Sequence, residues 1–173
     1  SKGRMGTVVP HGVLFRGGEE GKIRQGFIKE DLIEAIIGLP QNLFYGTGIP
    51  AALLIINKNK PINRKGNVMF IDGNQGFFKD GNKNKLRDED IQKITEAFDM
   101  YQDIERFAVV IDIKEIKENK YNLNISRYLN SVEEEEFVDI VGIIAEINEI
   151  KAKSKDTAKK LNKYLRELGF GEI

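Results

Sequence analysis

Short apolar segments alternate with polar, glycine-rich stretches along the first 130 residues of the chain. The apolar segments are rich in β-branched side chains, and most are bounded by Gly, Pro, Asn or Asp. This pattern predicts strands. The predicted strands are Met5–Pro10, Leu32–Leu39, Ala51–Ile56, Val68–Asp72 and Phe107–Ile111.

Two segments between the strands carry apolar residues at helical spacing. One is Glu20–Glu30; the other begins at Asp88, a residue type that caps helices, and has its apolar side chains at Ile91, Ile94, Phe98 and Tyr101. A short helical turn is expected at Ile113–Asn119. The remaining stretches are predicted as loops: His11–Gly21, Gln41–Pro50, an exposed Gly73–Arg87, and an irregular or short extended Tyr121–Tyr128.

The last part of the chain has a different pattern. Ser131 and Glu134 have the spacing of a capping box, and apolar residues then recur every seven positions on two adjacent rows. The seam is weakened at Lys151 and Ser154, so one long helix and two shorter helices both fit. Such a stripe needs a partner surface, which is either this chain's own domain or another helix.

Composition narrows the classes of protein. The 173 residues, 40% hydrophobic and 31% charged, fit one globular domain with an appendage. Equal numbers of basic and acidic residues, 27 of each, argue against a globally basic nucleic-acid binder but leave a local patch open. With no Cys and one His, neither a disulfide nor a metal site is predicted. The longest apolar run is too short to span a bilayer, and no signal peptide is visible, so a cytoplasmic location without membrane contact is expected.

One glycine motif imitates a dinucleotide site. Gly46 to Ala51 matches the G-x-G-x-x-A pattern, and Asp72 follows about twenty residues later. That mechanism requires the glycines to open a helix, whereas the run Ala51–Ile56 is too short to be one. The sequence therefore argues against a nicotinamide enzyme. The single histidine, His11, follows a strand end that often borders a ligand crevice, although a lone His is more often structural.

Two adjacent aromatic residues, Phe44 and Tyr45, lie in the same glycine-rich loop. They can form a platform for a planar ligand such as a nucleobase taken out of a DNA stack. Alternatively, one ring anchors the loop to the core while the other stays partly exposed. The two residues by themselves favour the second interpretation.

Longer strings favour a specific family. The segment Gly3–Gly18, then Ile23-Arg24, then Ile37–Pro50 resembles the modification (M) subunit of type I restriction–modification systems. These proteins are adenine-N6 DNA methyltransferases that use S-adenosylmethionine. Tyr121–Tyr128 resembles the segment that closes the same domain, so the resemblance covers roughly the first 130 residues. The tail resembles the family only in its general helical character.

The resemblance implies an α/β fold. Residues 1–130 would be the C-terminal part of a Rossmann-like S-adenosylmethionine-dependent methyltransferase sheet, and residues 131–173 a helical tail for subunit assembly. The strands Met5–Pro10, Leu32–Leu39 and Ala51–Ile56 would be the last three of a mixed sheet, with Ala51–Ile56 antiparallel between the other two. An incomplete sheet would leave an unpaired edge, which favours association.

The resemblance also implies roles for individual residues. Phe44 would stack on the flipped adenine with Tyr45 in reserve, which reverses the interpretation based on the two residues alone. The further DNA-contact candidates are His11, Arg16, Lys22, Arg24, Gly46 and Thr47. The implied partners are DNA, the specificity subunit on which the tail would dock, a second M subunit and the restriction subunit.

The family's catalytic motif is missing from the chain. An Asn/Asp-Pro-Pro-aromatic motif should hydrogen-bond the adenine amino group, but the four prolines, at positions 10, 40, 50 and 61, are never adjacent. No catalytic residue is therefore predicted. Together with the Ser1 start, this absence predicts a C-terminal fragment that neither methylates DNA nor binds S-adenosylmethionine alone. The alternative is a non-catalytic α/β interaction module whose tail forms a coiled coil.

Overall fold

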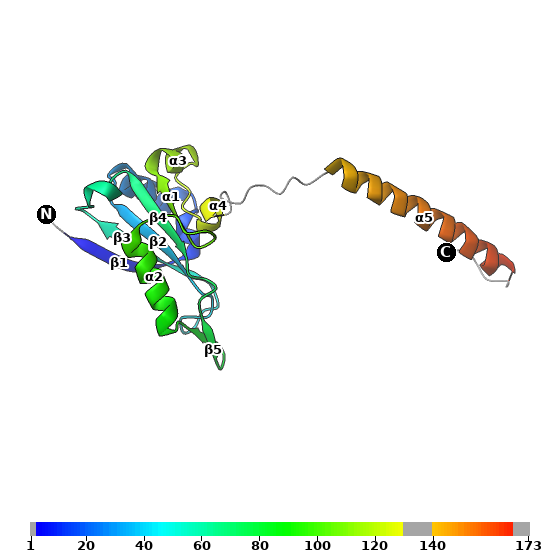
Figure 1. Cartoon of the computed structure of the whole chain (residues 1–173), viewed down its shortest axis with the longest axis horizontal. Coiled ribbons are helices and arrows are strands. Elements are labelled where there is room, and N and C mark those ends of the chain that lie inside the picture. The colour runs from blue at the N-terminus through cyan, green and yellow to red at the C-terminus, as the bar shows by residue number, and fades with distance from the viewer. Residues whose placement is uncertain (1–2, 130–139, 168–173) are drawn as a thin grey trace. The chain divides into compact units, whose positions relative to one another are not determined.

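The computed structural model describes residues 3–129 and 140–167, in two compact units, Ser1–Glu134 and Glu135–Ile173 (Figure 1). The first unit is built on a five-stranded sheet of order β1-β3-β2-β4-β7. Its strands are β1 (Arg4–Pro10), β2 (Ile33–Leu39), β3 (Ala51–Asn57), β4 (Asn67–Asp72) and β7 (Ala108–Asp112). All five predicted strands are therefore confirmed, to within a few residues at their ends.

The strand directions make the sheet mixed. β3 runs antiparallel to both β1 and β2 and lies between them, as the resemblance implies. β2 and β4 are parallel, and β7 is antiparallel to β4. The expectation that β1, β2 and β3 are the last three strands of the sheet is wrong, because β4 and β7 follow them in the chain and extend the sheet beyond β2. Because β3 is antiparallel to both β1 and β2, and β4 is parallel to β2, the strands β1, β2 and β4 point the same way.

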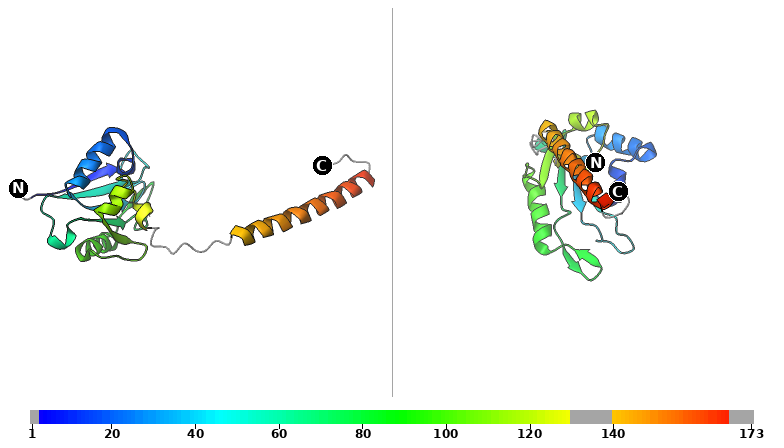
Figure 2. Two further views of the ribbon diagram at one scale, coloured as in Figure 1. Left: turned by 90° about the horizontal axis from the view of Figure 1, so that it is seen from above. Right: turned by 90° about the vertical axis from the view of Figure 1, so that its right-hand side faces the viewer.

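Helices cover the two faces of the sheet unequally (Figures 1 and 2). On one face α1 (Gly18–Lys29), α3 (Ile113–Glu118) and α4 (Ile125–Leu129) bury side chains such as Ile28, Ile116 and Tyr128. On the other face α2 (Asp88–Met100) packs Ala97 against Met69 and its neighbours. Two short 3-10 turns, η1 (His11–Leu14) and η2 (Ile62–Arg64), complete the unit.

The first strand is an edge of the sheet. Among the described strands β1 pairs with β3 alone, and Met5 and Val8 are about half exposed. Within the described sheet β1 lies at one end and β7 at the other. An open row of backbone donors and acceptors is a template for pairing with another strand.

Two short stretches differ from the prediction. The supposed exposed loop Gly73–Arg87 contains a hairpin, β5 (Phe78–Asp80) with β6 (Lys83–Lys85). The supposed irregular stretch Tyr121–Tyr128 instead leads into α4. Both elements are too short to have a recognisable period. The structure also begins α1 at Gly18, inside the predicted loop His11–Gly21, and η1 occupies the start of that loop.

The beginning of α2 also differs from the prediction. Asp88 is the first helical residue and Arg87 the N-cap. The capping acceptor is Asp90, whose carboxylate receives the backbone N–H of Arg87 at 3.0 Å and two guanidinium N–H groups of the same residue at 2.9 and 3.0 Å.

The second unit contains α5 (Ile140–Glu167), one continuous helix of 28 residues. It runs through Lys153 and Ser154 without a break, which settles the choice between one helix and two for this range. Exposed apolar side chains, Ile147, Ile150, Leu161 and Tyr164, lie along it. The predicted capping box at Ser131 and the boundary after residue 130 lie outside the described residues. No helix in the part of the chain that the structure describes is long and apolar enough to cross a membrane.

Candidate nucleic-acid interface

A polar cavity lies where the three co-directional strands end. His11 follows β1, Gln41 lies two residues beyond β2, and Asp72 is the last residue of β4. These three side chains line a cavity of about 370 Å³ together with Asn74, Asn124 and Ser126, among others. In open α/β sheets, ligands bind in a crevice outside the carboxyl ends of the parallel strands, and this cavity has that position.

Most side chains around the cavity are uncharged hydrogen-bonding groups, and Asp72 is the one carboxylate among the lining residues that the structure describes. Burial lowers the pKa of the His11 imidazole, and the carboxylate of Asp72 opposes this shift only in part. The ring is therefore neutral at pH 7, with one donor and one acceptor nitrogen. The Asp72 carboxylate accepts the backbone N–H of Asn74 at 3.0 Å. Such a wall suits an uncharged polar group better than a phosphate.

Gly73, between the cavity-lining residues Asp72 and Asn74, lies close to the backbone of β2. A Cβ on this residue would lie 2.6 Å from the carbonyl oxygen of Gly38 and 2.9 Å from Cδ1 of Ile94. We expect Gly73→Ala to lower the free energy of unfolding by about 1–3 kcal/mol, because backbone and packed side chain must both move. Chemical denaturation followed by circular dichroism measures this change.

Gly26→Ala is the matched control for that substitution. Gly26 lies inside α1, and a Cβ there meets nothing within 4 Å. Because alanine favours helix, this variant should be about 0.5–1 kcal/mol more stable than the parent. A Gly73→Ala protein as stable as the parent would show that the approach of β2 and β4 is looser than the structure has it.

The loop between β2 and β3 carries the two aromatic residues. Leu43 packs against the core on the α2 side of the sheet, whereas Phe44 is 37% exposed and Tyr45 91% exposed. Leu43, rather than either aromatic residue, therefore anchors the loop. Both rings lie outside the cavity lining, on the loop that runs from Gln41 to Pro50, two residues that do line the cavity.

The backbone of this loop is turned sharply. Gly46 has a φ of 78° and Asn42 a φ of 56°, a region that Gly and Asn tolerate best. The Thr47 hydroxyl accepts the backbone N–H of Ile49 at 3.1 Å. Gly48 is followed by strand β3 and not by a helix, so the dinucleotide motif is not used as one, in agreement with the argument from the sequence.

The predicted DNA-contact residues are placed very differently. Gly46 and Thr47 share the aromatic loop, and His11 lines the adjacent cavity. Arg16, just after η1, is exposed. Lys22 is exposed on α1, where it forms an ion pair of 2.7 Å with Glu19.

Arg24 has its donors occupied within the fold. It is 8% exposed and donates to the carbonyl oxygens of Tyr121, Val13 and Arg16 at 2.8, 2.7 and 3.0 Å. Burial lowers its pKa, and the carboxylate of Glu20 opposes that shift. We therefore assign Arg24 a structural role and keep the other five residues as DNA-facing candidates.

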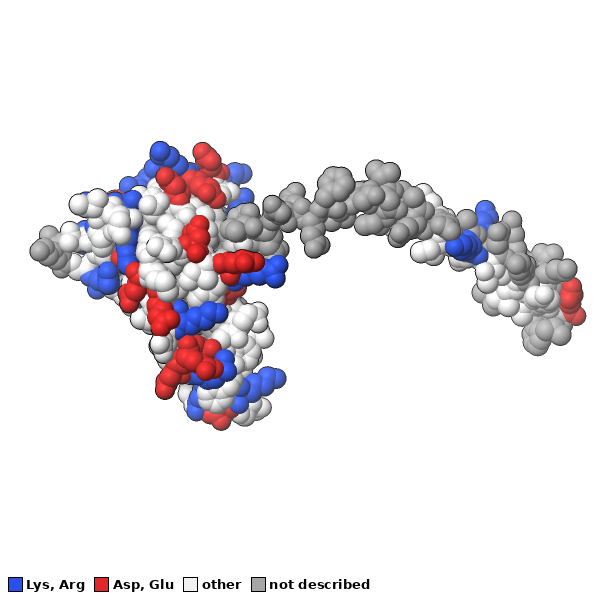
Figure 3. All heavy atoms as spheres, in the orientation of Figure 1, with Lys and Arg blue, Asp and Glu red and all other residues white. Residues whose placement is uncertain are grey.

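Several residues near the loop have no signature in the sequence. Lys83 and Asn84 of the hairpin contact the aromatic loop, and Asn74 and Asn124 line the cavity. Their only signal is membership of polar stretches, which describes exposed loops equally well. Over the visible face of the first unit, acidic and basic side chains are interspersed (Figure 3). In the described residues no cluster of three His, Cys, Asp or Glu has the arrangement of a metal site.

Comparison with known proteins relates the chain to DNA methylases. The sequence model of the N-6 DNA methylase family matches residues 1–137. The methylase subunit of the type I restriction enzyme MjaVIII of Methanocaldococcus jannaschii is 41% identical over 168 residues, which cover 95% of this chain and 29% of that protein. The methylase subunit of the type I restriction enzyme MpnII of Mycoplasma pneumoniae is 32% identical, covering 96% of this chain and 30% of the relative.

A solved structure agrees with these sequences. The methyltransferase subunit of a type I restriction–modification system from Streptococcus thermophilus is 46% identical and superposes with a TM-score of 0.68, over 72% of this chain and 26% of that one. The chain thus spans about three-tenths of the length of the curated relatives it matches.

Proposed function

The chain belongs to the N-6 DNA methylase family, among the modification subunits of type I restriction–modification systems, and from this premise we propose that its parent protein transfers a methyl group from S-adenosylmethionine to adenine N6 in DNA. In this proposal the chain supplies the surface that receives the flipped base. The observation that carries it is the loop Leu43–Gly46, in which Tyr45 is 91% and Phe44 37% exposed, within a longer loop whose ends, Gln41 and Pro50, line the polar cavity.

The geometry supports base stacking for a physical reason. An adenine taken out of the helix loses its stacking partners, and an exposed aromatic ring restores part of that energy. The loop carries two aromatic rings, and Leu43, which precedes them, packs against the core of the domain. Gly46 and Thr47 of the same loop and His11 of the cavity, together with Arg16 and Lys22, are retained as DNA-contact candidates.

The chemistry of methyl transfer is assigned to other parts of the parent protein. The Gly46–Gly48 motif does not fit an S-adenosylmethionine site, because it precedes a strand and not the N-terminus of a helix. The Asn/Asp-Pro-Pro-aromatic motif is also missing from the sequence. We derive no catalytic step from this chain and expect it to be inactive by itself, without bound cofactor.

The tail serves assembly in this proposal. Ile147, Ile150, Leu161 and Tyr164 expose apolar surface along one 28-residue helix, and such a helix is stabilised by a partner helix. Residues 1–130 would then be the methyltransferase part and residues 131–173 the assembly part. The partner expected for the tail is the specificity subunit, in a complex with a second M subunit and the restriction subunit. We also propose a cytoplasmic location, because it is consistent with membership of the type I restriction–modification family.

The stacking role is tested by Phe44→Ala and Tyr45→Ala in the full-length subunit, assembled with its partner subunits. Because base–aromatic stacking contributes about 1–3 kcal/mol, at least one variant should methylate cognate DNA roughly 5- to 150-fold more slowly. Single-turnover transfer of labelled methyl groups measures the rate. Fluorescence of 2-aminopurine at the target position measures base flipping.

Ile49→Ala is the matched control, because Ile49 is an exposed apolar residue of the same loop. It should leave both signals unchanged. Unchanged methylation in both aromatic variants would remove the stacking assignment and favour the alternative, a non-catalytic module that acts through its helical tail.

A further inference from the structure

The β5–β6 hairpin contacts the aromatic loop through three hydrogen bonds and one cation–ring contact. We propose that Lys83 and Asn84 are positioning residues that hold the Phe44–Tyr45 pair in a stacking-competent arrangement. This inference rests on the proposed base-stacking function and adds two residues to it that lie about forty positions further along the chain.

Asn84 fixes the base of the loop. It is 6% exposed, its side-chain amide donates to the carbonyl oxygen of Gln41 at 2.7 Å, and its backbone N–H donates to the carbonyl oxygen of Asn42 at 3.0 Å. These two carbonyls immediately precede Leu43. Both hydrogen bonds come from the buried Asn84, so they restrain the path of the chain as it enters the aromatic pair.

Lys83 reaches the tip of the loop. Its ammonium donates to the carbonyl oxygen of Phe44 and also lies over the Tyr45 ring, 5.3 Å from the ring centroid. A cation over one face of an aromatic ring is attracted by it. The other face of a ring that is 91% exposed then stays open for a planar ligand. One side chain thus restrains both members of the pair.

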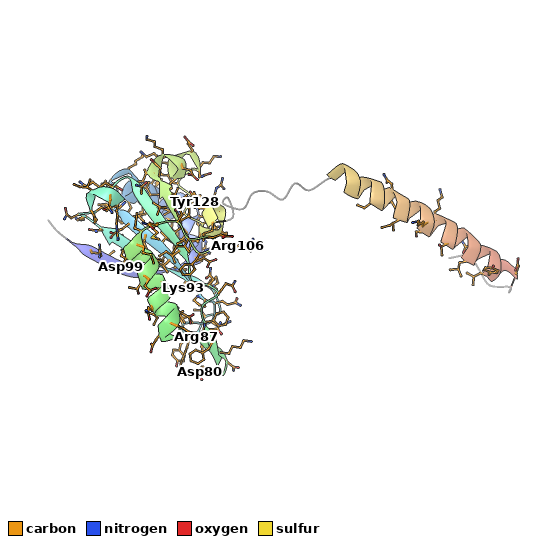
Figure 4. The ribbon with its side chains drawn as sticks, in the orientation of Figure 1. Asp80, Arg87, Lys93, Asp99, Arg106 and Tyr128 are labelled. Atoms are coloured by element: carbon orange, nitrogen blue, oxygen red, sulfur yellow. The ribbon has the colours of Figure 1, made fainter. Side chains whose placement is uncertain are left out.

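The hairpin is stabilised by contacts between its own strands and is joined to the start of α2. Its strands are paired from Phe78 with Lys85 to Asp80 with Lys83, and the Lys85 ammonium forms an ion pair with Asp80. Directly after it, Arg87 is bonded to Asp90 in the first turn of α2. Figure 4 shows Asp80 and Arg87 at the same end of the unit, beside the start of α2. The loop is therefore tied to the helical layer.

Such restraint matters for the rate of flipping and transfer more than for the affinity for DNA. Ordering the backbone of a free loop costs conformational entropy, and a loop that is already ordered avoids that cost when the base arrives. Loss of the hairpin contacts should therefore reduce the fraction of stacked, flipped base. Contacts to the DNA backbone elsewhere should be unaffected.

The test uses Lys83→Met and Asn84→Asp in the full-length subunit assembled with its partners. Asn84→Asp keeps the shape but replaces a donor by an acceptor. Each variant should lower the 2-aminopurine flipping signal and the single-turnover methylation rate about tenfold, the effect of losing one hydrogen bond that positions the loop, while the Kd for cognate DNA stays within about twofold. Lys83→Arg, which keeps both the donor and the cation, should restore most of the rate.

Lys79→Met is the matched control, because it removes the same charge from the other strand of the hairpin and should leave the rate unchanged. If the hairpin variants behave like this control while Phe44→Ala or Tyr45→Ala is slow, the positioning proposal is overturned and the stacking function stands. If neither aromatic variant is slow, the stacking function itself fails. If Asn84→Asp does not fold, Lys83→Met and its arginine rescue decide the question.

Discussion

Replacing Glu34 by leucine should lower the free energy of unfolding of the chain by about 3–5 kcal/mol, because it breaks a buried ion cluster from its centre. Glu34 is fully buried, at 0% exposure, and its carboxylate accepts from Arg64 at 3.1 Å and from the Asn57 side-chain amide at 3.0 Å. Arg4 on the edge strand forms a further ion pair with it, at 3.1 Å.

The position of Glu34 in the sheet explains its role. The pairing of β2 with β3 shifts register between Ile33 and Ala35, so Glu34 occupies a bulge. Its carboxylate joins β1, β2, β3 and the η2 turn, and its backbone carbonyl receives the Tyr101 hydroxyl at 3.1 Å. Removal of the carboxylate leaves the Arg64 guanidinium buried without its carboxylate partner, although Arg64 still packs over the Tyr101 ring at 4.5 Å.

The double variant Glu34→Leu with Arg64→Met is the control for this explanation. Replacing both buried charges by apolar groups removes the uncompensated guanidinium, so the double variant should recover a substantial part of the lost stability. Chemical denaturation followed by circular dichroism gives both values. A single Glu34→Leu variant within 1 kcal/mol of the parent would contradict the role assigned to the cluster.

Replacing Arg24 by methionine should lower the free energy of unfolding by about 3 kcal/mol. The side chain donates to three backbone carbonyls, those of Val13, Arg16 and Tyr121, and methionine leaves all three without this donor. Because these carbonyls belong to segments on both sides of α1 in the sequence, the loss should loosen η1 and the turn before α4 together. Hydrogen exchange resolved by segment measures this effect directly.

Lys22→Met is the matched control on the same helix. Lys22 is exposed and forms a surface ion pair with Glu19, so its loss should change stability by no more than about 0.5 kcal/mol. The two variants also separate a structural Arg24 from a DNA contact. An Arg24→Met protein with unchanged stability but a weaker, less salt-dependent affinity for DNA would restore the role implied by the resemblance.

The sequence alone predicts the individual strands of the sheet, because a strand is recognised from the side chains of a short continuous segment. A run such as Ala51–Ile56, closed by proline at one end and an Asn-Lys repeat at the other, has the length and side chains of a buried strand whatever surrounds it. The insertion of this strand between β1 and β2 came from the family resemblance, and not from periodicity. Strand order depends on contacts between segments far apart in the chain, which periodicity does not report.

The hairpin and α4 were missed for a different reason. Three-residue strands and a five-residue helix have too little length for a hydrophobic period, and such short elements are stable only through tertiary contacts. In α4 these contacts are the burial of Ile125 and Tyr128, the latter with its ring 4.5 Å from that of Phe70. In the hairpin they include the bonds of Asn84 to the aromatic loop.

The same division applies to the candidate site. The sequence by itself determined the loop with Phe44 and Tyr45 and the place of His11 after a strand end, because these are statements about residue type and neighbours. The family resemblance added that the catalytic motif is missing. Only the tertiary structure decided that Arg24 is bonded inside the fold, that Leu43 anchors the loop, and that Lys83 and Asn84 contact it. The partners in those bonds lie as far as 97 positions apart, and side-chain bonding over such separations is set by packing, which no local pattern encodes.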